Sequence, residues 1–304
     1  MTNIHTEEVH EDFEQFDTWD LEKRLGVLIG ANQRAVDAVA RALPELTSAA
    51  AGIRERLTLG GRLVYIGAGT SGRLALQDAA ELPPTFGFGR AVVLLAGGEA
   101  AGKEAQEGAE DDEDAARDAV REAEVGSMDA VIGLAASGGT PYTVAGVEEA
   151  RARGAFTVGV ANNPGSRLLE VAECPVLLAT GPEVIAGSTR LAAGTAQKVA
   201  LGALSTAVMP ELGGVYKNLM VGMEPVNDKL YKRAAQMAQT ATGKPRARVE
   251  AALRETDWRI GEAILRLETG LSVDASRDLL ARHPRLRDAL EQASKDQASK
   301  DQED

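Results

Sequence analysis

The stretch Arg62-Leu63-Val64-Tyr65-Ile66-Gly67-Ala68-Gly69-Thr70-Ser71-Gly72-Arg73 places an apolar run directly before a glycine loop with two hydroxyl side chains. Short apolar runs rich in β-branched residues are typical of strands buried on both faces of a parallel sheet. Such a strand leads through a loop into a helix, whose first N–H groups are free and whose dipole favours an anion. We therefore expect Gly69, Thr70 and Ser71 to contact a phosphate.

A second stretch of the same kind follows later in the chain. The apolar run over 130–136 leads into Ser137-Gly138-Gly139-Thr140-Pro141. Glycine allows the backbone to approach a ligand closely, and the hydroxyls add hydrogen-bond donors suited to a phosphate. Two such loops in one sheet indicate a single phosphorylated ligand held between them, with Ser137, Gly138 and Thr140 among its contacts.

The first loop also fits a competing pattern. Its glycines have the G-x-G-x-x-G spacing of dinucleotide-binding proteins, and an acid, Glu99, follows the next expected strand. Dinucleotide loops prefer small apolar residues where this chain has Thr70 and Ser71, and they give no reason for a second hydroxyl-rich loop. A phosphosugar is the favoured ligand, and a dinucleotide is the alternative.

The chain predicts an α/β fold with a parallel sheet between helices. Strands are expected over 63–66, 92–96, 131–135, 156–160 and 176–179. After Thr242-Gly243-Lys244-Pro245 the pattern changes to short amphipathic helices. The expected organisation is an N-terminal arm over 1–17, a main domain over 18–240, a small helical domain over 245–292 and a disordered tail over 293–304.

Composition excludes several classes of function. A formal charge of −13 argues against nucleic-acid binding, and no apolar run is long enough to span a membrane. With Cys174 as its one cysteine the chain can form no internal disulfide, so we expect a cytoplasmic location. The three histidines, His5, His10 and His283, have no metal-ligand spacing, so we expect no metal and no cofactor.

Because no histidine lies in the expected main domain, carboxylates are the candidates for acid–base catalysis. Glu81 lies in Asp78-Ala79-Ala80-Glu81, in the last turn of a helix expected to end before Pro83. The helix dipole disfavours an acid there, which is a hint of function. Glu110 lies in an acidic run that would otherwise be read as a solvated surface, and Glu183 precedes a long helix, where an acid is common.

Several motifs together resemble the N-acetylmuramic acid 6-phosphate etherase family. Besides the first loop, they are Asp78-Ala79-Ala80-Glu81 with Pro83-Pro84-Thr85, Glu107-Gly108-Ala109-Glu110-Asp111, Asn163-Pro164-Gly165-Ser166, Gly181-Pro182-Glu183-Val184, Gly187-Ser188-Thr189-Arg190, Ala193-Gly194-Thr195-Ala196-Gln197-Lys198 and Asn218-Leu219-Met220-Val221. The resemblance implies a sugar isomerase (SIS) type three-layer sandwich with a five-stranded parallel sheet, and a homodimer. Pairing is expected through the small apolar positions of 191–204.

The resemblance also implies an activity and its residues. The family cleaves the lactyl ether of N-acetylmuramic acid 6-phosphate to N-acetylglucosamine 6-phosphate and D-lactate during peptidoglycan recycling. Carried over to this sequence, Glu81 would protonate the departing lactate and Glu110 would be the second catalytic carboxylate. Beyond the two loops, the implied substrate contacts are Glu183, Ser188, Thr189 and Lys198.

Four positions depart from the family pattern. Ala80 and Leu82 stand where the family usually has Ser and Cys, and Gly139 and Ala192 stand where it has Arg and Lys. Each lost cationic contact is worth about 1.5–3 kcal/mol. Either other basic residues, such as Arg73, Arg190 or Lys198, compensate, or the substrate differs.

Two alternatives to the etherase therefore stay open. A non-catalytic phosphosugar sensor, like the related glucokinase regulatory protein, would keep the loops without turnover. An aldose–ketose isomerase would need a base near C2 but would release no carboxylic acid.

Overall fold

The computed structural model describes residues 5–104, 106 and 108–300. The chain divides into two compact units. The first comprises Met1–Ala79 and Arg90–Ser205, and the second comprises Ala80–Gly89 and Thr206–Asp304. Among the described helices, none is long and apolar enough to cross a membrane.

The first unit is built on a five-stranded parallel sheet with the order β2-β1-β3-β4-β5. The strands are β1 (Leu63–Gly67), β2 (Ala91–Leu95), β3 (Ala130–Ala135), β4 (Phe156–Ala161) and β5 (Cys174–Leu177). The chain leaves β1 toward β2 on one side and returns to β3 on the other, so the winding direction reverses between β1 and β3. Ligands bind at such a reversal in open α/β sheets.

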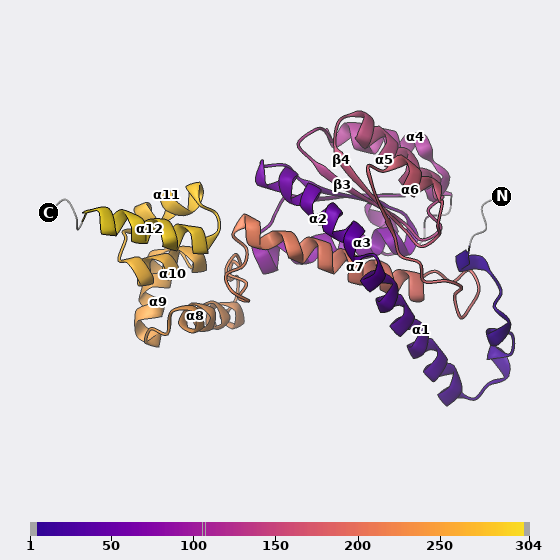
Figure 1. Cartoon of the computed structure of the whole chain (residues 1–304), viewed down its shortest axis with the longest axis horizontal. Coiled ribbons are helices and arrows are strands. Elements are labelled where there is room, and N and C mark those ends of the chain that lie inside the picture. The colour runs from indigo at the N-terminus through magenta and orange to yellow at the C-terminus, as the bar shows by residue number, and fades with distance from the viewer. Residues whose placement is uncertain (1–4, 105, 107, 301–304) are drawn as a thin grey trace. The chain divides into compact units, whose positions relative to one another are not determined.

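Helices cover both faces of this sheet, as Figure 1 shows, with α2, α3 and α7 on one side and α4, α5 and α6 on the other. Along β1, Val64 and Ile66 pack in the cluster that includes residues of α4 and α5. Tyr65 points to the opposite face, where its hydroxyl donates to Asp78 of α3 at 2.7 Å. The side chains of β1 therefore alternate between the helix layers on the two faces of the sheet. The predicted three-layer sandwich is confirmed. The helices that lie wholly or mainly in this unit are α1 (Leu21–Arg41), α2 (Leu43–Thr58), α3 (Gly69–Phe86), α4 (Glu113–Glu122), α5 (Pro141–Ala152), α6 (Arg167–Val171) and α7 (Ala192–Val208).

The second unit is helical and has a core of its own. Ala234, Ala238, Leu253 and Ile264 are fully buried in one apolar cluster. Its helices are α8 (Asp228–Thr242), α9 (Arg246–Glu255), α10 (Ile260–Thr269), α11 (Val273–Arg282) and α12 (Leu286–Lys300).

The unit boundaries differ from those expected. The division falls after Ser205 instead of residue 240, because α8 contributes alanines to the helical core. The tail expected to be disordered from residue 293 is helical through Lys300, since Ala289 and Ala293 pack one helical turn apart into that core. The rest of that predicted tail, 301–304, lies outside the described residues.

The N-terminal arm contains three short 3₁₀ turns, η1 (His5–Glu7), η2 (Glu11–Phe13) and η3 (Phe16–Thr18). Most of its described side chains are exposed or half-buried, but Thr6 is completely buried. The arm is therefore anchored near its start.

An ion pair ties the starts of β1 and β3 together at the amino edge of the sheet. Buried Asp129 accepts from Nε and Nη2 of Arg62 at 3.1 and 2.8 Å, and from the backbone N–H of Arg62 at 3.0 Å. The N–H of Gly126 donates to it at 3.1 Å. Burial favours the neutral acid, but these hydrogen bonds and the Arg62 charge outweigh it and lower the pKa of Asp129.

We predict that Asp129→Ala lowers the free energy of unfolding by about 2–4 kcal/mol at pH 7, because it leaves the N–H donors of Arg62 and Gly126 without their acceptor. A lowered folded-state pKa gives stability that is complete above the unfolded pKa of about 3.9 and is lost as pH falls through the lower folded value. Urea unfolding at pH 7 and pH 3 would measure both effects. Asp37→Ala, at an exposed position of α1, is the control, and equal unfolding midpoints for the two variants at pH 7 would contradict the prediction.

Candidate active site

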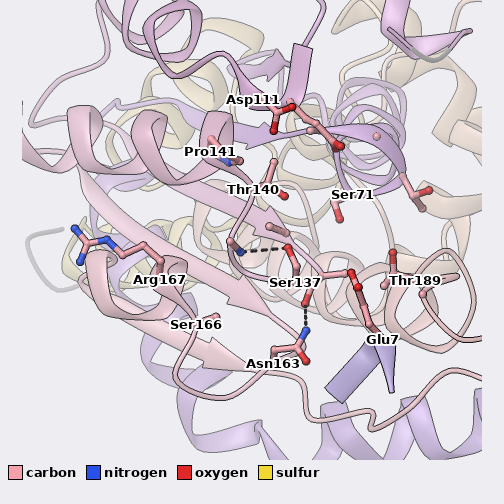
Figure 2. A pocket seen from close by; sticks show the side chains of 18 of the residues that line it. Glu7, Ser71, Asp111, Ser137, Thr140, Pro141, Asn163, Ser166, Arg167 and Thr189 are labelled. Carbon is pink, nitrogen blue, oxygen red and sulfur yellow. Dashed lines mark hydrogen bonds between the residues drawn. The ribbon is translucent and has the colours of Figure 1, made fainter. Parts of the chain in front are cut away.

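A cavity of about 560 Å³ opens at the carboxyl ends of β1 and β3, where the sheet reverses its winding (Figure 2). Helix α3 begins there at Gly69 and α5 begins at Pro141. The first N–H groups of each helix lack intrahelical acceptors, and the positive ends of both dipoles lie at this edge. The two hydroxyl-rich loops are thus neighbours, as the sequence predicted.

Ser71 on the first loop belongs to a buried chain of hydrogen bonds. Its hydroxyl donates to Oε1 of Gln197 at 2.8 Å, and Nε2 of Gln197 donates to Oδ1 of Asn162 at 3.1 Å. Asn162 in turn donates to the carbonyl of Leu178 at 2.9 Å. Because Gln197 and Asn162 are almost fully buried, this chain fixes the first loop against α7 and β4.

Ser137 on the second loop is arranged differently. Its Oγ accepts a hydrogen bond from the N–H of Gly139 at 3.2 Å, so its own proton is available for a ligand oxygen. The preceding turn requires glycine at position 138, where φ is +70° and a Cβ would lie 2.1 Å from Oγ of Ser166. Ser137 is therefore the better placed of the two serines to donate to a phosphate.

The remaining wall of the cavity combines neutral donors with carboxylates. Of the predicted residues, Gly69, Thr70, Ser71, Glu110, Ser137, Thr140 and Thr189 line it. Glu110 lies on the short turn η5 (Ala109–Asp111) and is exposed. Residues that the sequence did not select also line it, among them Glu7, Asp111, Asn163, Ser166, Arg167 and Gly187.

Other predicted residues are absent from the described lining, namely Glu81, Gly138, Glu183, Ser188 and Lys198. Gly138 instead forms the turn that follows Ser137. Glu183 is 1% exposed, and its two oxygens accept from the N–H groups of Ala192 and Ala193, both at 2.9 Å. Burial raises the pKa of Glu183, although these two bonds oppose the rise. Glu183 thus caps α7 in this structure and does not face the cavity.

Glu81 lies on α3 at an exposed position. The helix continues through Pro83 and Pro84 to Phe86, so the expectation that it ends before Pro83 is wrong. Each proline removes the donor to the carbonyl four residues earlier and its ring crowds that carbonyl, but the helix here continues past both. Glu81 consequently lies inside the helix and not in its last turn.

The charge in the cavity wall is mostly negative. Glu7, Glu110 and Asp111 carry carboxylates, whereas Arg167 is the one cationic side chain among the described lining residues. Arg167 pairs with Glu148 at 2.6 Å and with Glu170 at 3.4 Å, and Figure 2 shows its guanidinium directed away from Ser137. A bound phosphate would therefore be held chiefly by backbone N–H groups and hydroxyls.

Gly139 and Ala192, the two positions where this chain lacks the cationic residue usual in the family, have different surroundings. A Cβ at Gly139 would meet only Oγ of Ser137, at 4.0 Å, so the space for a side chain is open. Ala192 is buried, and its N–H is bound by Glu183. Arg73, one of the residues expected to compensate, donates Nε to the carbonyl of Ala101 at 3.0 Å.

Comparison with known proteins agrees with this fold. Residues 45–150 match the family described as glucokinase regulatory protein N-terminal SIS domain, and residues 111–207 match the SIS domain family. The first unit is therefore an SIS domain. A solved phosphoheptose isomerase from Neisseria gonorrhoeae is 16% identical, covers 62% of this chain and 98% of its own, and has a TM-score of 0.48.

Relatives that cover most of the chain identify the family. The N-acetylmuramic acid 6-phosphate etherase of Deinococcus radiodurans is 50% identical over 268 residues, which is 88% of each chain. The etherase of Cronobacter sakazakii is 46% identical over 254 residues, 83% of this chain and 86% of its own. This chain belongs to the N-acetylmuramic acid 6-phosphate etherase family, as its motifs indicated.

We predict that Ser137→Ala weakens binding of N-acetylglucosamine 6-phosphate by about tenfold, because a donor to the phosphate is lost. Calorimetric titration would measure the change, with Ser48→Ala on an exposed face of α2 as the control. In the wild-type protein the phosphorylated sugar should raise Tm and the unphosphorylated sugar should not. Equal stabilisation by both sugars would contradict the phosphate assignment, and stabilisation by NAD would support the dinucleotide alternative.

Proposed function

We propose that this chain cleaves the lactyl ether of N-acetylmuramic acid 6-phosphate, with water, to N-acetylglucosamine 6-phosphate and D-lactate. The observation that carries the proposal is 50% identity over 88% of the chain to an enzyme of that name. The donor-rich cavity at the ends of β1 and β3 supports it. The protein is thus a carbon–oxygen lyase with a phosphorylated amino sugar as substrate.

The phosphate fits best at the two helix N-termini. Backbone N–H groups from Gly69 to Ser71 and the hydroxyls of Ser137 and Thr140 can donate to its oxygens. Phosphate binding to such neutral donors needs no side-chain cation in contact. In this arrangement Glu110 is left for the sugar, since a carboxylate repels the phosphate dianion.

The chemistry explains the need for two carboxylates. In the open-chain sugar the C1 aldehyde acidifies the C2 proton, which a base removes to leave an enolate, and the C3–O bond to lactate then breaks. An acid protonates the departing lactate oxygen, and water then adds to C3 of the unsaturated aldehyde. We assign the base to Glu110 and the acid to Glu81, the latter from the family resemblance.

Incubating the protein with N-acetylmuramic acid 6-phosphate and assaying D-lactate tests the function. Release of D-lactate with turnover supports it. Tight binding without lactate release or exchange of the C2 proton would favour a phosphosugar sensor. Isomerisation without acid release would favour an aldose–ketose isomerase.

We predict that Glu110→Gln lowers the etherase rate at least about 100-fold while binding of the phosphosugar is retained, since the amide keeps the shape but cannot accept the proton. Exchange of the C2 proton with deuterium should slow equally. Glu81→Gln should also lower lactate release but should leave C2 exchange detectable. Asp118→Asn, exposed on α4, is the control, and full activity in either glutamine variant would refute the role of that residue.

We further propose that the chain forms a homodimer in the cytoplasm. Leu21, Leu25 and Ile29 recur every fourth residue on α1, so they share one face, and they are 73%, 58% and 68% exposed. Exposed apolar stripes of this kind are typical of contact surfaces. Many small side chains of 191–204, where pairing was expected, are instead buried within the first unit. The α1 face is thus the better candidate for the dimer contact. For the location, the single cysteine, Cys174, is compatible with a reducing compartment.

We predict that wild-type protein has the mass of a dimer in light scattering and that Leu25→Glu shifts it toward a monomer, because a charge in the apolar contact is not compensated. Leu59→Glu, at an equally exposed apolar position of the first unit, is the control. Circular dichroism would confirm that both variants are folded. A wild-type monomer with full activity would refute the proposal.

A further inference from the structure

The arm reaches the cavity through one completely buried residue. The N–H of Thr6 donates to Oδ1 of Asn163 at 3.2 Å, and Nδ2 of Asn163 donates back to Oγ1 of Thr6 at 3.0 Å. The carbonyl of Thr6 accepts from the N–H of Gly187 at 3.2 Å. All three polar groups of Thr6 are therefore bonded to residues that line the cavity.

The hydrogen bonds of Thr6 connect the arm, through Asn163, to the second phosphate loop. Asn163 also donates to the carbonyl of Ala136 at 2.9 Å, immediately before Ser137 (Figure 2). One network of hydrogen bonds thus joins the arm, the loop after β4 and the second phosphate loop. Ordering the arm costs conformational entropy, which these bonds and the burial of Thr6 offset.

The next residue, Glu7, lines the cavity together with Ser137 and Thr189 (Figure 2). Its carboxylate is exposed and can only accept hydrogen bonds when ionised. Its charge would repel a phosphate or another carboxylate, so it is not suited to bind either anionic group of the substrate. The groups it can bind are neutral donors, the sugar hydroxyls and the acetamido N–H.

We propose that the arm is a wall of the substrate site and that Glu7 selects the sugar by accepting a hydrogen bond from one of these neutral donors. The inference rests on the proposed function for the identity of the sugar. Thr6 is the positioning residue, which holds Glu7 in place through Asn163 and Gly187. Glu7 therefore distinguishes an amino-sugar phosphate from phosphate alone.

The test compares Glu7→Ala with Glu11→Ala, which changes an exposed acid of the same arm outside the described cavity lining. Losing a charge-assisted hydrogen bond should weaken binding of N-acetylglucosamine 6-phosphate about 10- to 100-fold. Binding of inorganic phosphate should stay the same or tighten. In turnover, KM should rise more than kcat falls.

Thr6→Val keeps the size of the side chain but loses the hydrogen bond from Nδ2 of Asn163 to Oγ1, while the backbone bond to Oδ1 stays, so it should show the same pattern more weakly. If Thr6 acts through Glu7, the double variant should bind no worse than Glu7→Ala alone, within about threefold. Independent, additive losses would assign Thr6 a merely structural role and overturn its positioning role.

The decisive outcomes separate this inference from the function itself. If Glu7→Ala binds the sugar phosphate as Glu11→Ala does, or loses inorganic phosphate equally, the inference is overturned even where D-lactate is released. If the wild-type protein releases no D-lactate yet Glu7→Ala loses the sugar phosphate selectively, the inference stands and the proposed function fails.

Discussion

The site depends on the parallel pairing of β1 with β3. The register runs from Leu63 opposite Ala130 to Gly67 opposite Leu134, so the two strands end nearly level. Parallel neighbours deliver their following loops to the same edge, and the next helices begin with their positive ends side by side. The Arg62–Asp129 pair fixes the opposite ends of the same two strands. A slip in this register would separate the donors that we propose for the phosphate.

In the proposed function, a chain with a net charge of −13 would bind an anion here without a cationic pocket. Long-range electrostatics oppose the approach of a phosphosugar, so the binding energy has to come from short, directed hydrogen bonds. Such donors need precise placement, which the buried chain from Ser71 through Gln197 to Asn162 supplies. The open space at Gly139 is consistent with a loop that acts through its backbone.

The sequence was most informative where local chemistry decides the structure. Each strand was predicted to within two residues, because buried parallel strands are continuous apolar runs. The two neighbouring hydroxyl-rich loops followed from glycine spacing next to those runs. Glu183 shows the limit, since an acid before a helix can bind a ligand or cap the helix, and only tertiary burial separates the two roles.

Residues without a periodic pattern could not be found in this way. Glu7 and Thr6 lie in a polar arm, and their partner Asn163 is distant in sequence, so no local signal connects them. The helix α12 was missed because its charged repeats resemble a disordered tail, although Ala289 and Ala293 have the spacing of a helix face.

The anchoring of Thr6 has a consequence for synthesis on the ribosome. The arm leaves the exit tunnel before its partners Asn163 and Gly187, which follow at least 157 positions later. Domains generally fold as units while the chain elongates. The arm must therefore remain without its partners until strand β4 and the segment before α7 have emerged, and the wall that completes the cavity is made before the residues that hold it.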